Sequence, residues 1–108
     1  MTNAVFKKEG RSAAAEISGH AGYEKGGADI VCAACSMLAY TLLRQIAEEE
    51  RKGIVTYMCA DVSGGRVFIS AEWSEEGDER LSAVFDTVKT GFYMLMEEYP
   101  EFVRAEER

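Results

Sequence analysis

The chain has one histidine, His20, which precedes Cys32 by twelve residues. A thiol becomes a nucleophile at neutral pH when a nearby base or the positive end of a helix stabilises its thiolate. An apolar segment follows Asp29, and aspartate is a preferred N-cap, so we expect a helix that begins at this residue. Cys32 would then be the third helical residue, beside backbone amides without a partner. This pattern predicts a cysteine-histidine site.

The segment between the two residues is rich in glycine, which predicts a loop because neither strand nor helix interiors use glycine so densely. A loop from Ala21 to Ala28 is long enough to fold the imidazole of His20 back over the start of the helix. His20 could then hold the Cys32 thiolate and protonate a leaving amine. The expected reaction is peptide hydrolysis through an acyl-enzyme.

Several neighbours of this pair could orient it or assist the reaction. Backbone amides of Cys32 and Ala33, or those of the glycine loop, could donate to an oxyanion. Asp29 could orient His20, although capping the helix already accounts for an aspartate there. Ser36 lies one helical turn after Cys32 and could line the site. The residues expected to orient the pair or to bind substrate are Asp29, Ser36, Gly22, Tyr23, Gly26 and Gly27.

Three other interpretations of the cysteines were weighed. Cys32 and Cys35 have the spacing of a dithiol redox motif, but such a motif follows a buried strand and faces a cis-proline, whereas Pro100 is the only proline here. Zinc bound by the three cysteines and His20 is disfavoured because Cys35 falls within a helix and Cys59 within a strand. In the third interpretation Cys32 is an ordinary buried residue. We expect no metal and no cofactor.

Residue alternation, glycine turns and helical periodicity predict six elements along the chain. The expected elements are strands over Thr2–Lys8 and Ser12–Ser18, a helix from Asp29 to about Glu50, strands over Ile54–Val62 and Arg66–Trp73, and a helix from Asp78 that ends before Pro100. Both helices would cover one face of the sheet and bury their apolar sides there. The expected fold is α+β, with two layers, a sheet of about four strands, two helices and the order ββαββα.

The first predicted helix is apolar on nearly all sides over its first four turns, which implies that more than one side is covered. One apolar stripe faces the expected sheet, and further apolar residues lie on other sides. The stripe is Val31, Cys35, Leu38, Leu42 and Ile46, and the other apolar residues are Met37, Tyr40 and Leu43. A two-layer domain of this size cannot cover all of them alone. We therefore expect part of this helix to lie in a homodimer interface.

Composition limits the setting of such a site. With 108 residues and 47% hydrophobic content, residues 1–108 are expected to form a single domain. The formal net charge of -7 argues against nucleic acid as the main ligand and favours a basic peptide or protein. There is no continuous run of about 18 apolar residues and no export signal. We expect free thiols and a cytoplasmic protein that does not bind membranes.

The residues Gly19-His20-Ala21, followed by Asp29–Ala34 and Ser36, resemble the signature of the ribosomal-processing cysteine protease Prp family, also called YsxB-like. The resemblance extends over essentially the whole chain. It implies that His20 and Cys32 form the catalytic dyad of a homodimeric α+β enzyme, with the glycine-rich loop as a cover over the site. It also implies a substrate, the N-terminal extension of a large-subunit ribosomal protein, whose basic character agrees with the acidic charge of this chain.

One residue departs from the family pattern, because the position of Cys35 is more usually aliphatic. We therefore expect Cys35 to be a core residue, although it also offers an oxidation partner for Cys32. The leading hypothesis is a cysteine endopeptidase that acts through His20 and Cys32. The alternative is a non-catalytic dimeric module that binds a ribosomal protein or an assembly factor and holds a peptide without turnover.

Overall fold

The computed structural model describes residues 1–19 and 28–108 of the chain. Its elements are β1 (Thr2–Glu9), β2 (Ser12–Ser18), α1 (Ala28–Arg51), β3 (Val55–Ser63), β4 (Arg66–Trp73), a short 3-10 helix (Glu75–Gly77), α2 (Asp78–Glu98) and β5 (Val103–Glu107). The predicted α+β class and the order of the first six elements are confirmed. The strand β5 at the end of the chain was not predicted.

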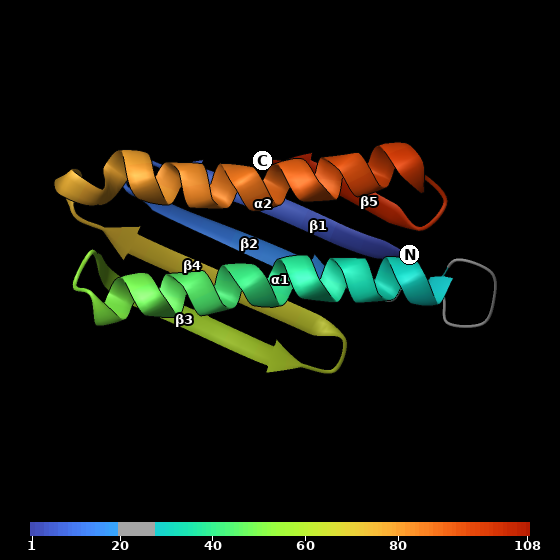
Figure 1. Ribbon diagram of the computed structural model, residues 1–108, viewed down its shortest axis with the longest axis horizontal. Helices are drawn as coiled ribbons and strands as arrows, with labels where there is room; N and C mark the ends of the chain where they lie inside the picture. Colours follow the sequence, from blue (N-terminus) through green and yellow to red (C-terminus); the bar gives the residue numbers. More distant parts are fainter. Residues whose placement is uncertain (20–27) are drawn as a thin grey trace.

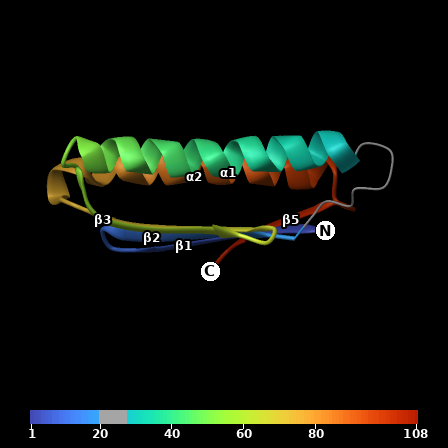
Figure 2. The same cartoon turned by 90° about the horizontal axis from the view of Figure 1, so that it is seen from below.

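The five strands form one mixed sheet in the order β3-β4-β2-β1-β5. Neighbouring strands are antiparallel except β5, which runs parallel to β1 and pairs Val103 with Thr2. Both helices lie on the same face of the sheet, side by side and in opposite directions (Figures 1 and 2). The start of α1, the N-terminus and the β3–β4 turn are all at one end of the molecule (Figure 1).

The fifth strand changes the predicted sheet from about four strands to five. Only Val103 and Ala105 of β5 are buried, and the rest of this short strand is charged. Two alternating apolar residues are too few for a sequence-based strand prediction. Pairing with β1 gives these five residues their conformation, so β5 depends on a partner at the other end of the chain.

The core lies between the sheet and the helix layer. Alternate residues of β1, β2 and β4 point toward the helices, as the period of two in a strand requires. The predicted stripe of α1 is also buried, except that Leu38 is only partly covered. The largest fully buried apolar side chains are Phe92, Leu42, Ile46, Ile69, Leu81, Val31 and Val103.

The first helix differs from the prediction in two respects. It begins at Ala28, so Asp29 lies in its first turn and is not the N-cap. By length and composition alone, the stretch Ile30–Arg51 is long and apolar enough to cross a membrane. This was not predicted, because the sequence has no continuous apolar run of that length. One side of this helix packs on the sheet through Val31, Leu42 and other core residues.

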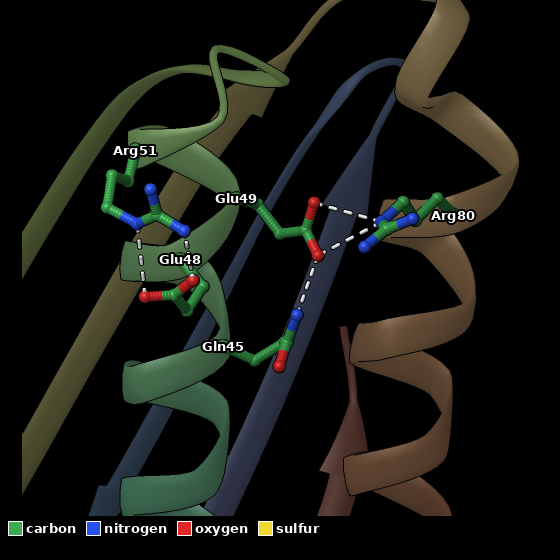
Figure 3. A network of polar contacts seen from close by, with 5 residues as sticks. All are labelled: Gln45, Glu48, Glu49, Arg51 and Arg80. Carbon is green, nitrogen blue, oxygen red and sulfur yellow. Dashed lines mark hydrogen bonds and ion pairs between the residues drawn. The ribbon is translucent and has the colours of Figure 1, made fainter.

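A buried carboxylate joins the two helices at the end of the molecule away from the start of α1. Glu49 of α1 has no exposed surface and pairs with Arg80 of α2, whose Nε lies 2.9 Å from Oε1. The side-chain amide of Gln45 donates to Oε2 of Glu49 at 2.6 Å (Figure 3). Burial alone would raise the pKa of Glu49, but the bonds from Arg80 and Gln45 lower it below its ordinary value.

Candidate active site

An open pocket of about 420 Å³ lies between the first half of α1 and the adjacent end of the sheet. Three parts of the fold form its described wall: one side of α1, the ends of β1 and β2, and the turn between β3 and β4. The lining residues are Thr2, Ile17, Gly19, Cys32, Cys35, Ser36, Ala39, Tyr40, Val62, Ser63, Gly64, Gly65, Arg66 and Val67. The pocket is therefore lined by residues that are far apart in the sequence.

Cys32 is partly exposed and faces this pocket. It is the fifth residue of α1 and not the third, because the helix begins at Ala28. In an α-helix the amide of residue i donates to the carbonyl of residue i−4, so the Cys32 amide pairs with the Ala28 carbonyl. The Ala33 amide likewise donates to the carbonyl four residues before it in the helix. Regular helical pairing therefore uses both amides, which argues against them as oxyanion donors.

Cys35 has a different environment from Cys32, although both contribute to the pocket wall. It is only 4% exposed and belongs to the hydrophobic core, as expected from its position in the stripe. Burial raises the pKa of the Cys35 thiol to about 11, with a smaller opposing effect from the Thr2 hydroxyl and a further increase from Cys32. Cys35 is therefore a neutral thiol near pH 7, which makes it a poor nucleophile.

The third cysteine lies elsewhere. Cys59 is exposed on β3, which is an edge strand, and does not line the pocket. All three cysteines are free thiols. Within residues 1–19 and 28–108, no group of three or more histidine, cysteine, aspartate or glutamate side chains could hold a metal ion.

Of the residues predicted to assist the site, Ser36 is placed most clearly. It is exposed and lines the pocket one helical turn after Cys32. Asp29 lies in the first turn of α1, and its side chain is not described. The remaining predicted residues, His20, Gly22, Tyr23, Gly26 and Gly27, lie outside the described part of the chain.

Several residues of the pocket were not predicted from the sequence. Tyr40 is 46% exposed and lines the wall one turn beyond Ser36, a position that the spacing of four residues from Cys32 to Ser36 to Tyr40 could have indicated. Val62, which is 49% exposed, and the turn after it come from the β3–β4 hairpin. No local signal could place this hairpin against α1, because the contact depends on the order of strands in the sheet.

Arg66 is the charged residue of the described pocket lining. Its guanidinium bonds to Glu16 and lies 3.2 Å from Oδ2 of Asp61, on the sheet face away from the helices. The bond to Glu16, opposed by some burial and supported by Asp61, raises the pKa of Arg66. Two carboxylates thus balance this positive charge, and the described pocket wall is otherwise neutral.

The fold and this pocket define an α+β protein with a partly exposed helical thiol that is available to a ligand, an arrangement expected of a cysteine-dependent enzyme. The family described as "Cysteine protease Prp" matches residues 1–104. The chain belongs to the cysteine protease Prp family, and it is an enzyme that hydrolyses peptide bonds. Family membership favours the endopeptidase over the non-catalytic module.

Solved structures support the fold over the full length of the chain. SMU.848 from Streptococcus mutans is 29% identical with a TM-score of 0.71, and the match covers 99% of this chain and 93% of that one. The essential ribosomal processing protease Prp from S. aureus, in complex with a substrate peptide, is 18% identical with a TM-score of 0.76 and full coverage of both chains. The same protease with a covalently linked product peptide is 19% identical, with a TM-score of 0.70 and full coverage of both chains. No curated protein matches the chain in sequence.

Proposed function

We propose that this protease removes the N-terminal extension of a large-subunit ribosomal protein, with Cys32 as nucleophile and His20 as its base. The observation that carries the proposal is that Cys32 and Gly19 line the same pocket. His20 follows Gly19 directly, and consecutive Cα atoms are about 3.8 Å apart. The residue bonded to His20 therefore lies in the wall of the pocket that Cys32 faces.

The reaction follows from the chemistry of these two groups. His20 accepts the thiol proton of Cys32, and the thiolate attacks the carbonyl carbon of the scissile peptide bond. The carbon-nitrogen bond then breaks as His20 returns the proton to the leaving amine, which leaves a thioester on Cys32. Water, deprotonated by His20, hydrolyses the thioester and releases the second product. No step of this reaction uses a metal or a cofactor.

The assisting roles belong to the residues around this dyad. Ser36 lies on the pocket wall, where its hydroxyl can bond to a bound peptide. Asp29 orients His20 from the first turn of the helix, and Gly22, Tyr23, Gly26 and Gly27 contact the substrate. The oxyanion donors are amides of the glycine-rich segment, since those of Cys32 and Ala33 are used within the helix.

The substrate follows from the relatives and from charge. The S. aureus protease is described as ribosomal processing, and it has been solved with a substrate peptide and with a covalently linked product peptide. A covalent product is what an acyl-transfer mechanism on a cysteine leaves behind. The net charge of -7 favours association with a basic ribosomal protein.

The test is cleavage of the extended ribosomal protein, followed by intact-mass spectrometry. Wild-type enzyme is expected to shorten the substrate at a single bond near its N-terminus. Cys32→Ala and His20→Ala should each abolish this cleavage, whereas Cys59→Ala, an exposed cysteine outside the pocket, should retain it. Cleavage by Cys32→Ala would refute the assignment of the nucleophile.

We also propose that the enzyme is a cytoplasmic homodimer. The support is an apolar groove between the outer sides of α1 and α2, lined by Ala34, Met37, Leu38, Gly91, Met94, Leu95, Glu98 and Tyr99. Met37 and Met94 are 67% and 62% exposed, and Ile30 nearby in the sequence is 68% exposed. Exposed apolar surface of this kind is stabilised by a protein partner. A second copy would cover the side of α1 that the sheet leaves open.

A further inference from the structure

Gly19 occupies the point at which the chain leaves the sheet. It follows β2 directly, lines the Cys32 pocket and precedes the proposed catalytic histidine, His20. Its neighbour Ser18 is paired on both sides, with Asn3 of β1 and with Arg66 of β4. The backbone that enters Gly19 is therefore fixed by an antiparallel sheet.

Gly19 itself is held by two further parts of the molecule. Its amide donates to the carbonyl of Gly65 in the β3–β4 turn at 3.0 Å. Its φ is +86°, and the Cβ of an L-residue at this position would overlap the carbonyl oxygen of Met1. The chain start is anchored as well, because the Thr2 amide donates to the Phe102 carbonyl at 2.8 Å. Glycine is thus required here both for its φ and for its missing side chain.

The turn whose carbonyl accepts the Gly19 amide bond is a tight hairpin turn. Gly64 and Gly65 have φ values of +41° and +78°, the signs that a two-residue type I′ hairpin turn requires. The residues on either side of them, Ser63 and Arg66, are paired across the hairpin. A hydrogen bond to a tight hairpin turn on one side and the close approach of the Met1 carbonyl on the other therefore restrict the backbone of Gly19.

We propose that Gly19 is a positioning residue for the dyad: its backbone fixes the point at which the chain leaves the sheet immediately before His20. The inference rests on the proposed function, because it gives Gly19 a role only if His20 is the base. A misplacement of about 1 Å in a catalytic group can lower a rate about 100-fold. At Gly10, Gly53 and Gly64, which also have positive φ values, an added Cβ would have open space around it.

The first experiment compares Gly19→Ala with Gly10→Ala. Gly10 lies in the β1–β2 turn with a φ of +57° and no atom near an added Cβ, so both substitutions introduce backbone strain. Only Gly19→Ala disturbs the pocket wall. We expect Gly19→Ala to lower kcat about 100-fold with KM changed less than about threefold, and Gly10→Ala to keep kcat within about twofold. Equal losses of kcat in the two variants, or a loss confined to KM, would overturn the proposal.

The second experiment leaves Gly19 and all its contacts intact, so it applies even where Gly19→Ala does not fold. One glycine is inserted between Gly19 and His20, and in a matched variant one glycine is inserted between Glu24 and Lys25, two residues of the same connection that have no assigned role in the reaction. Both insertions lengthen the same connection equally, so their chain-entropy costs are the same. The first moves His20 away from the fixed point, whereas the second keeps it there.

We expect the insertion after Gly19 to lower kcat at least about tenfold more than the insertion after Glu24, at closely similar melting temperatures. Equal kcat values in the two variants would overturn the positioning role. This outcome differs from failure of the proposed function, which would appear as His20→Ala cleaving the extended substrate at the wild-type rate.

Discussion

Cys32 and Cys35, near the start of α1, have different environments, and this difference assigns their roles. Cys32 is partly exposed to the pocket, whereas Cys35 points into the core one turn later. The raised pKa of Cys35, about 11, keeps its sulfur protonated over the whole physiological range. A protonated thiol attacks an oxidised partner slowly. The environment of Cys35 therefore argues for packing and against a redox role.

Alkylation can check this difference directly. In the folded protein at pH 8, iodoacetamide is expected to leave Cys35 unmodified, because the thiol is both buried and protonated, and to modify the exposed Cys59. In denaturant both should react. Peptide mapping by mass spectrometry gives the modified fraction of each residue. Rapid modification of Cys35 in the native state would contradict its assignment to the core.

At the scale of elements, the ion pair between Glu49 and Arg80 joins α1 to α2. Its two sides are not equivalent, since the Glu49 side chain is fully buried while that of Arg80 is 50% exposed. Removing the arginine would leave a buried carboxylate with Gln45 as its remaining side-chain partner. Such an uncompensated buried charge is much more costly than the loss of a solvated one.

We therefore expect Arg80→Ala to lower the free energy of unfolding by about 3 kcal/mol. The matched control is Arg51→Ala, which removes an exposed pair with Glu48 on the same helix and should leave stability unchanged within error. Urea unfolding followed by circular dichroism measures both. Equal stability of Arg80→Ala and Arg51→Ala would show that the buried pair does not hold the helices together.

At the scale of the whole molecule, the helix layer has one covered side and one open side. The covered side packs on the sheet, and the open side carries the groove with Met37 and Met94. The sequence analysis inferred a dimer from the apolar character of α1. Because these residues are exposed and line a groove between the two helices, the proposed contact lies on the helix layer, which covers one face of the sheet (Figure 2).

Sedimentation velocity tests the dimer. Wild-type protein at micromolar concentration is expected to sediment as a dimer, and Met37→Glu should shift it to monomer because a charge would be buried in the contact. Tyr57→Glu, a substitution of an exposed residue on the edge strand β3, should not change the sedimentation coefficient. A monomeric wild type, or a dimer that Tyr57→Glu dissociates, would contradict an interface on the helix layer.

The sequence predicted the elements well where the signal is local. The apolar periodicity from Asp78 predicted α2 with its observed first residue, and glycines indicated both hairpin turns. The predicted helix had Asp29 as its N-cap, whereas α1 begins at Ala28, because aspartate is favoured both as N-cap and within the first turn. The family, too, followed from two short blocks of residues and is confirmed over residues 1–104.

What the sequence by itself determined is the family, the order of the first six elements and the residue types available for chemistry, because each depends on neighbours along the chain. Only the tertiary structure decided which residues share the pocket, that Cys35 is buried and that β5 pairs with β1. It also decided that the Gly19 amide bonds to Gly65 and that the Met1 carbonyl leaves no room for a side chain at this position. These features arise from strand order and helix packing, which bring together residues whose local sequences carry no information about one another.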